Sequence, residues 1–373
     1  MSTPPGASLP NHDGRLAALD ALRFVAASSV LAFHYFFRGS SAPGFLDVGY
    51  PEVAGMAMYG YLGVNLFFMI SGFVIAWSAE GRGAVTFALL RFARIYPAFA
   101  VCMSLTCLVA FTAADPRVPV SAAQWLANLF IFSPAAGQPF VDGVYWSIVL
   151  ELIFYGWMTL GIATGLIKSR LLILVAGWML ISAINEFVLN SSALRVLLIT
   201  EYSGWFAVGI LMHRLRTVGS SFYAFVLLFA AMLLATATSF RGQEWMVEHY
   251  GVALEDTELI AAVLALFAIF IATVRFGGAV RSTPLLLAIG GLTYPLYLLH
   301  QNIGYITLNC LSPLLGRWTA SLVVVIAMVA LAYLVFRWIE LPARRWLACK
   351  LRARPVIPDG SSDNATGNQA VSA

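Results

Sequence analysis

Runs of apolar residues long enough to cross a bilayer recur along this chain, and they restrict its fold more than any other feature. A helix needs about 20 residues to span the hydrocarbon core, because each residue adds about 1.5 Å. Charged residues make up only 11% of the 373 residues, against about 25% in a soluble domain. The sequence therefore predicts an all-α, polytopic integral membrane helix bundle.

Ten segments reach spanning length, and they predict about ten transmembrane helices. They are 17–37, 57–79, 95–113, 146–167, 171–189, 197–215, 222–240, 257–275, 284–306 and 318–340. Segment 121–133 is too short to span and suits an interfacial or re-entrant position. We expect residues 1–15 to be a disordered cytoplasmic lead and residues 16–345 to form the membrane domain. Residues 346–373 are expected to be a basic and then disordered cytoplasmic tail.

The distribution of Lys and Arg predicts the orientation. With the N-terminus inside, 17 of the 22 Lys and Arg residues lie on the cytoplasmic side or at inner helix ends, and 5 lie outside. This bias predicts that both termini are cytoplasmic in a multi-pass protein of the cytoplasmic (inner) membrane. The four cysteines lack the spacing of a disulfide framework or metal site. No basic stripe on a soluble domain supports nucleic-acid binding.

The first expected span carries ionisable residues where lipid makes them costly. Arg23 and His34 are eleven residues apart, so they lie within about 20° of one helical face and about 16 Å apart along it. Intramembrane ionisable groups usually face a bundle interior or a watery cavity. The first span therefore resembles the wall of a site rather than a simple anchor.

Further polar residues fall at a similar depth in the outer half of the membrane. Ser147, Glu151 and Tyr155 recur every four residues and share one face of the fourth span. His300 lies about two turns from the outer end of the ninth span, near the expected depth of His34. A carboxylate beside an imidazole can orient a general base. The same residues could instead hold the helices together by hydrogen bonds.

The expected cytoplasmic layer is rich in arginine. Arg91 and Arg94 precede the third span, and Arg23 lies near the inner end of the first. Planar guanidinium groups bind phosphate oxygens in pairs. The positive-inside rule alone also accounts for arginines at inner helix ends, so both interpretations of Arg91 and Arg94 stay open.

Taken together, five motifs resemble the acyltransferase-3 family of polytopic membrane proteins, which includes the O-acetylases of bacterial surface sugars. The motifs are Arg23-x10-His34, GVNLFFMISGF (63–73), RFAR before IYP (91–97), WSIVLELIFY (146–155) and LTYPLYLLH (292–300). The resemblance covers residues 16–345 in the order of the family.

This resemblance implies transfer of an acyl group, commonly acetyl, from cytoplasmic acyl-CoA to a hydroxyl of a glycan, glycolipid or glycosylated small molecule. It implies acyl-CoA as a co-substrate and no permanently bound cofactor or metal. By motif position, Arg23, Arg91 and Arg94 match the acyl-CoA side, His34 the catalytic histidine and Glu151 the motif carboxylate. The remaining candidates, for substrate binding, are Asn65, Ser71, Ser147, Tyr155, Tyr297 and His300. Some members carry an added extracytoplasmic domain, so we expect any second transfer step here to need a separate partner.

The leading hypothesis makes His34 the general base of direct transfer, with Glu151 orienting or charge-balancing it. A transient acyl-histidine is a less favoured variant. One alternative is a proton-coupled secondary transporter in which His34, Glu151 and His300 form a relay, although the paired repeats of many transporters are not detected. Another is a scaffold whose buried polar residues serve packing alone.

Overall fold

The computed structural model describes residues 12–41 and 44–352 of the chain. Residues 1–11 of the expected lead and 353–373 of the expected tail lie outside this range. Helix α1 begins at His12, so residues 12–15 are helical, where a disordered lead was expected. At the other end, α14 continues to Arg352, and the first part of the expected basic tail is therefore a helix.

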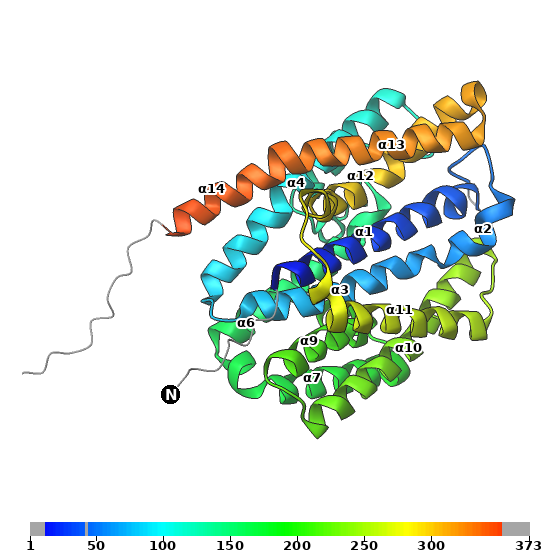
Figure 1. The fold of residues 1–373 in the computed structure, drawn as a ribbon. Coiled ribbons are helices and arrows are strands. Elements are labelled where there is room, and N and C mark those ends of the chain that lie inside the picture. Colours follow the sequence, from blue (N-terminus) through cyan, green and yellow to red (C-terminus); the bar gives the residue numbers. More distant parts are fainter. Residues whose placement is uncertain (1–11, 42–43, 353–373) are drawn as a thin grey trace, which may run out of the picture.

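Within the described residues the fold is a bundle of α-helices joined by short 3₁₀ and π-helical turns, and these residues form no strand (Figure 1). The α-helices are α1 (His12–Phe36), α2 (Pro51–Ala57), α3 (Gly63–Ala79), α4 (Ala84–Ala113), α5 (Ala122–Asn128), α6 (Trp146–Ala163), α7 (Leu166–Ile184), α8 (Ser192–Leu197), α9 (Ser203–Thr217), α10 (Phe222–Tyr250), α11 (Asp256–Phe276), α12 (Pro284–Leu315), α13 (Arg317–Val335) and α14 (Leu341–Arg352). The predicted all-α class is confirmed.

Eight helical stretches of the described chain are long and apolar enough to cross a membrane, and they correspond to eight of the ten expected spans. The other two expected spans are 197–215 and 284–306. The first contains α9, which has only 15 residues and is too short to cross alone. The second falls in α12, which has 32 residues but mixes apolar side chains with Tyr, His, Gln and Asn. Both helices are instead largely buried within the bundle.

Helix α1 lies inside the bundle, where it contacts α3, α11 and α12 (Figure 1). Glycine permits its close approach to α3, since a Cβ at Gly63 would lie 2.5 Å from the carbonyl oxygen of Ala26. The α3–α9 contact is equally tight, because a Cβ at Gly72 would lie 2.2 Å from the Phe206 carbonyl oxygen. Gly63 and Gly72 of the 63–73 motif therefore allow α3 to pack closely against two neighbouring helices.

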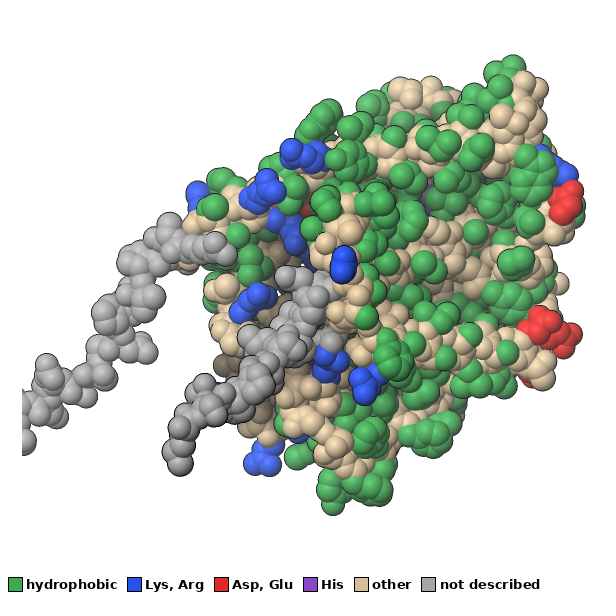
Figure 2. All heavy atoms as spheres, in the orientation of Figure 1, with side chains coloured by type: hydrophobic (Ala, Val, Ile, Leu, Met, Phe, Trp, Pro, Cys, Tyr) green, Lys and Arg blue, Asp and Glu red, His purple; other side chains and the backbone are tan. Residues whose placement is uncertain are grey.

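Charged side chains separate toward the two ends of the bundle. Figure 2 shows Lys and Arg side chains gathered at the end where α14 finishes, and acidic side chains at the opposite end. We call the first end the basic end. Arg23 of α1 lies toward it, and His34 lies eleven residues further along the same helix, which is about 16 Å of helical rise.

Candidate functional site

A cavity of about 610 Å³ lies at the basic end, and arginines from three helices line it. We call it the basic cavity. Arg23 comes from α1, Arg91 and Arg94 from α4, and Arg344 and Arg345 from α14. The Nε atom of Arg91 is buried and has no hydrogen-bond partner in the part of the chain that the structure describes. The three arginines expected to act together therefore do line one cavity, with two more that were assigned only to topology.

Three carboxylates line the same cavity and offset part of this charge. Asp20 pairs with Arg23 at 2.8 Å, one turn away on α1. Glu340 accepts from Arg344 at 3.1 Å, and Glu151 lies on α6. Five guanidinium groups against three carboxylates leave the basic cavity with excess positive charge. Such a cavity favours an anionic ligand with several oxygens.

Glu151 lies in the basic cavity with two hydroxyl partners. Ser71 Oγ of α3 donates to Glu151 Oε1 at 3.1 Å, and the Tyr155 hydroxyl one turn along α6 donates to the same oxygen. The expectation that Glu151 orients His34 is corrected, because the two side chains line different cavities and neither is a hydrogen-bond partner of the other. The three predicted residues Ser71, Glu151 and Tyr155 thus form one cluster on the basic side.

His34 lines a second, larger cavity of about 820 Å³, which we call the wide cavity. The histidine is only 6% exposed and does not turn outward to lipid. Its Nδ1 atom lies 2.8 Å from the Val30 carbonyl oxygen and 3.1 Å from Nε2 of His300. Gln301, which lines the same cavity, is a further hydrogen-bond partner of the His34 imidazole. The Nε2 atom of His34 is the ring nitrogen that does not face Val30 or His300, so a ligand hydroxyl in the wide cavity can approach it beside Gln301.

His300 lies behind His34 on α12 and is itself almost fully buried. Its Nδ1 atom lies 2.9 Å from the Tyr297 carbonyl oxygen and 3.2 Å from that of Leu296. The imidazole does not line either cavity. His300 therefore contacts His34 rather than the space where a substrate would bind, contrary to its expected role in substrate binding.

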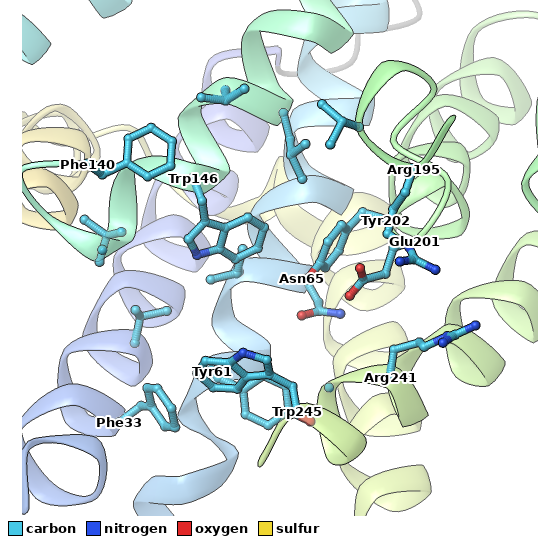
Figure 3. A pocket seen from close by; sticks show the side chains of 18 of the residues that line it. Phe33, Tyr61, Asn65, Phe140, Trp146, Arg195, Glu201, Tyr202, Arg241 and Trp245 are labelled. Carbon is cyan, nitrogen blue, oxygen red and sulfur yellow. The ribbon is translucent and has the colours of Figure 1, made fainter. Parts of the chain in front are cut away.

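Aromatic and polar side chains alternate around the wide cavity (Figure 3). Asn65 is 6% exposed, its amide points into the cavity, and no described residue bonds to it. Arg38 donates to Gln301 Oε1 at 2.8 Å beside His34. The labelled aromatic side chains around the space are Phe33, Tyr61, Phe140, Trp146, Tyr202 and Trp245. This combination of flat apolar faces and hydrogen-bonding groups suits an amphipathic organic ligand.

A buried ionic network holds one side of the wide cavity. The fully buried Glu186 side chain pairs with Arg195 at 3.0 Å and Arg241 at 3.7 Å. Thr200 also donates to this carboxylate. Because both arginines bind Glu186, they are positioned on the cavity side by the α7–α9 connection. Burial raises the pKa of the neighbouring Glu201 above its usual range, despite the Tyr202 hydroxyl and the two arginines.

The two cavities adjoin at side chains that line both of them, which we call the wall. Val64 and Tyr297 line both of them. The Tyr297 hydroxyl lies 2.8 Å from Ser147 Oγ and 3.3 Å from the Val144 carbonyl oxygen. Its ring packs edge-on against Phe67, with centroids 5.7 Å apart. Ser147 and Tyr297, both expected to bind substrate, therefore meet where the two cavities adjoin.

The structure also brings in residues that sequence reasoning did not single out. Arg344 and Arg345 complete the basic cavity, and Arg38 and Gln301 sit beside His34. One signal was available for Gln301, because it directly follows His300 at the end of a motif. Arg344 and Arg345 carried no such signal, because the positive-inside rule alone accounts for arginines at an inner helix end. Arg38 carried none because it belongs to no motif.

Comparison with known proteins gives one family and one relative. The family model described as an acyltransferase domain matches residues 16–337 of the chain. An acyltransferase named MdmB from Streptomyces mycarofaciens is 31% identical over 159 residues. That match covers 39% of this chain and 39% of the relative, so the chain spans well under half the length of that protein. No solved structure matches the chain significantly.

Proposed function

This chain belongs to the acyltransferase-3 family of membrane acyltransferases, and from that premise we propose that it is an acyl-CoA-dependent O-acyltransferase. The acyl group in this proposal is acetyl. The acceptor is a hydroxyl of a glycan, a glycolipid or a glycosylated small molecule. The protein lies in the inner membrane with its basic end on the cytoplasmic side, in line with the positive-inside rule.

Coenzyme A suits the basic cavity by its charge. Its phosphates match a cavity with five arginines and three carboxylates, two of which already pair with neighbouring arginines. Guanidinium forks bind phosphate oxygens in pairs, and the low-dielectric surroundings strengthen each contact. The pantetheine arm of the donor can then extend toward Ser147 and Tyr297 at the wall.

The acceptor suits the wide cavity by its shape and polarity. Sugar rings present apolar C–H faces to aromatic side chains and hydroxyls to polar ones. Trp146 and Tyr202 supply such aromatic faces, while Asn65 and Gln301 supply amide groups. An acceptor held there would place a hydroxyl beside His34.

In the proposed acyl transfer, His34 acts as the base and a hydroxyl at the wall contacts the reacting carbonyl. His34 Nε2 takes the proton of the acceptor hydroxyl while its oxygen attacks the thioester carbonyl carbon. The C–S bond then breaks, and the proton passes to the departing thiolate of coenzyme A. The Tyr297 hydroxyl, whose partners in the structure are Ser147 Oγ and the Val144 carbonyl oxygen, would turn from them to donate to the developing carbonyl oxyanion. Exclusion of water between the helices limits hydrolysis of the thioester.

The single observation that carries this proposal is that His34 lines the wide cavity, which shares its wall with the arginine-lined basic cavity. The test is mass spectrometry of surface glycans and small glycosides from cells with the intact chain, with His34→Ala, and with no chain. We expect an acyl mass increment only with the intact chain. An equal increment with His34→Ala, folded in the membrane, would exclude His34 as base or acyl carrier.

A further inference from the structure

His34 and His300 form a direct pair of imidazoles from two helices far apart in the sequence. The atoms His34 Nδ1 and His300 Nε2 lie 3.1 Å apart, with ring centroids 4.9 Å apart and an interplanar angle of 73°. Both residues are buried. This distance fits an N–H···N hydrogen bond, and the angled rings allow one nitrogen to face the other.

The neighbouring carbonyls decide where the hydrogens lie. His300 Nδ1 faces the Tyr297 and Leu296 carbonyl oxygens, which only accept, so this nitrogen carries the hydrogen. In neutral His300 the Nε2 atom is then a bare acceptor. It accepts from His34 Nδ1–H, which also faces the Val30 carbonyl oxygen. His34 Nε2 is therefore the unprotonated nitrogen, and it can accept from a ligand hydroxyl beside Gln301, which also bonds to this imidazole.

A general base that gains a proton needs a partner for the new positive charge. Within residues 12–41 and 44–352, no carboxylate is hydrogen-bonded to either imidazole. The nearby charged side chain is Arg38, which repels a cation rather than stabilising it. The role that a carboxylate plays beside many catalytic histidines is left here to His300.

We propose that His300 is a positioning residue that accepts the Nδ1 hydrogen of His34 and shares the proton taken from the acceptor. This inference rests on the proposed function. When His34 Nε2 takes the hydroxyl proton, the pair holds one extra proton, carried on His34 or passed along the Nδ1–H···Nε2 bond to His300. When coenzyme A leaves, the proton returns through His34 Nε2 to the thiolate. No proton or electron is left over.

The kinetic test compares two substitutions at position 300 in protein reconstituted with acetyl-CoA and the unacylated form of the acceptor, taken from cells without the chain. His300→Leu fills the volume without an acceptor, whereas His300→Gln places an amide oxygen near the position of Nε2. We expect kcat to fall about 10- to 100-fold in His300→Leu, less than loss of the general base itself would cost, because His34 remains. KM for acetyl-CoA should stay within about threefold, and His300→Gln should recover most of the lost kcat.

Two outcomes would overturn the proposal: kcat within about threefold of wild type in folded His300→Leu, or equal losses in His300→Leu and His300→Gln. His213→Gln is the matched control, because His213 is also buried but lies 3.4 Å from Glu80 and lines neither cavity. It should leave kcat unchanged.

A second measurement needs no substitution at position 300 to fold. Nitrogen-15 NMR of histidine-labelled wild-type protein in lipid should show His34 protonated at Nδ1, with a through-bond coupling to the bare Nε2 of His300. Absence of that coupling would overturn the pairing. If wild-type protein transfers no acyl group while the coupling is present, the proposed function fails and the imidazole pair stands.

Discussion

Ser147 and Tyr297 meet hydroxyl to hydroxyl, 2.8 Å apart, at the wall shared by the two cavities. The Tyr297 ring contributes to both linings, and the Ser147 hydroxyl also donates to the Val144 carbonyl. The contact joins α6 to α12 at the level where donor and acceptor would meet. The ring and the hydroxyl of Tyr297 therefore have roles that can be tested separately.

Removing the Tyr297 hydroxyl should slow acyl transfer, and removing the Tyr297 ring should increase hydrolysis of the acyl-CoA donor. Tyr297→Phe keeps the wall but loses one hydroxyl donor, so we expect kcat to fall about 10- to 100-fold. Tyr297→Ala opens the wall, so we expect acetyl-CoA hydrolysis without acceptor to rise several-fold. Thiol release measured with and without acceptor separates the two effects. Equal hydrolysis in both variants would contradict a barrier made by the ring.

Arginines of the basic cavity should matter only for donors that carry phosphates. We expect Arg91→Gln and Arg94→Gln each to raise KM for acetyl-CoA about tenfold, the usual cost of one charge-assisted contact. KM for acetyl-pantetheine, which lacks the nucleotide phosphates, should change little. Arg82→Gln is the control, since Arg82 is exposed and lines neither cavity. An equal loss with both thioesters would argue against phosphate recognition there.

Glu151→Gln should affect the donor side rather than the basicity of His34. Because the substitution removes one of three carboxylates from the basic cavity, we expect acetyl-CoA to bind about two- to fivefold more tightly. Gln can still bond to Ser71 and Tyr155. Isothermal titration with acetyl-CoA in detergent checks this result. Weaker binding would mean that the carboxylate contacts the donor favourably or holds the site in shape.

The buried Glu186 should contribute strongly to stability. Glu186→Leu leaves Arg195 and Arg241 without their shared carboxylate, at a cost of about 3 kcal/mol. Thermal unfolding should show a lower Tm. Adding Arg195→Leu should recover part of the loss, because one unpaired cation is then removed. Glu248→Gln, at an exposed site without an ion pair in the described residues, should leave Tm unchanged.

Glu201 should make stability depend on pH, because burial raises its pKa in the folded protein. A folded-state pKa above the unfolded value of about 4.3 means that the folded protein binds this proton more tightly. The carboxylate therefore destabilises the fold above its folded pKa, and this penalty disappears as the pH falls below the unfolded value. We expect Glu201→Gln to raise Tm by about 1–3 °C at pH 8 and not at pH 4. The same gain at both pH values would contradict the shift.

Helical periodicity predicted the bundle and several side-chain groupings correctly. The spacing of Ser147, Glu151 and Tyr155 placed them on one face, and all three line the basic cavity. Arg23 and His34 both line cavities from the same helix, as their spacing predicted. These features follow from the helix repeat alone, which needs no knowledge of neighbouring helices.

Neighbour relations between helices could not be predicted in the same way. The sequence gives the depth of a residue along a helix only to about one turn, roughly 5.4 Å. It therefore placed Glu151 and His34 at one level, whereas the two side chains line different cavities. Sequence placed Glu151, His34 and His300 in one layer, but only the two histidines touch. Contacts of this kind depend on helix rotation and on close approaches such as Gly72 against Phe206.

The side chains of Val64 and Tyr297 at the wall bear on the permeability of the membrane to ions. An open bore through a bilayer would short-circuit the ion gradients on which the cell depends. On the proposed function, donor and acceptor would meet where the two cavities adjoin, and Val64 and Tyr297 would narrow the passage between them. Transfer would then consume the thioester without a continuous path for ions across the membrane.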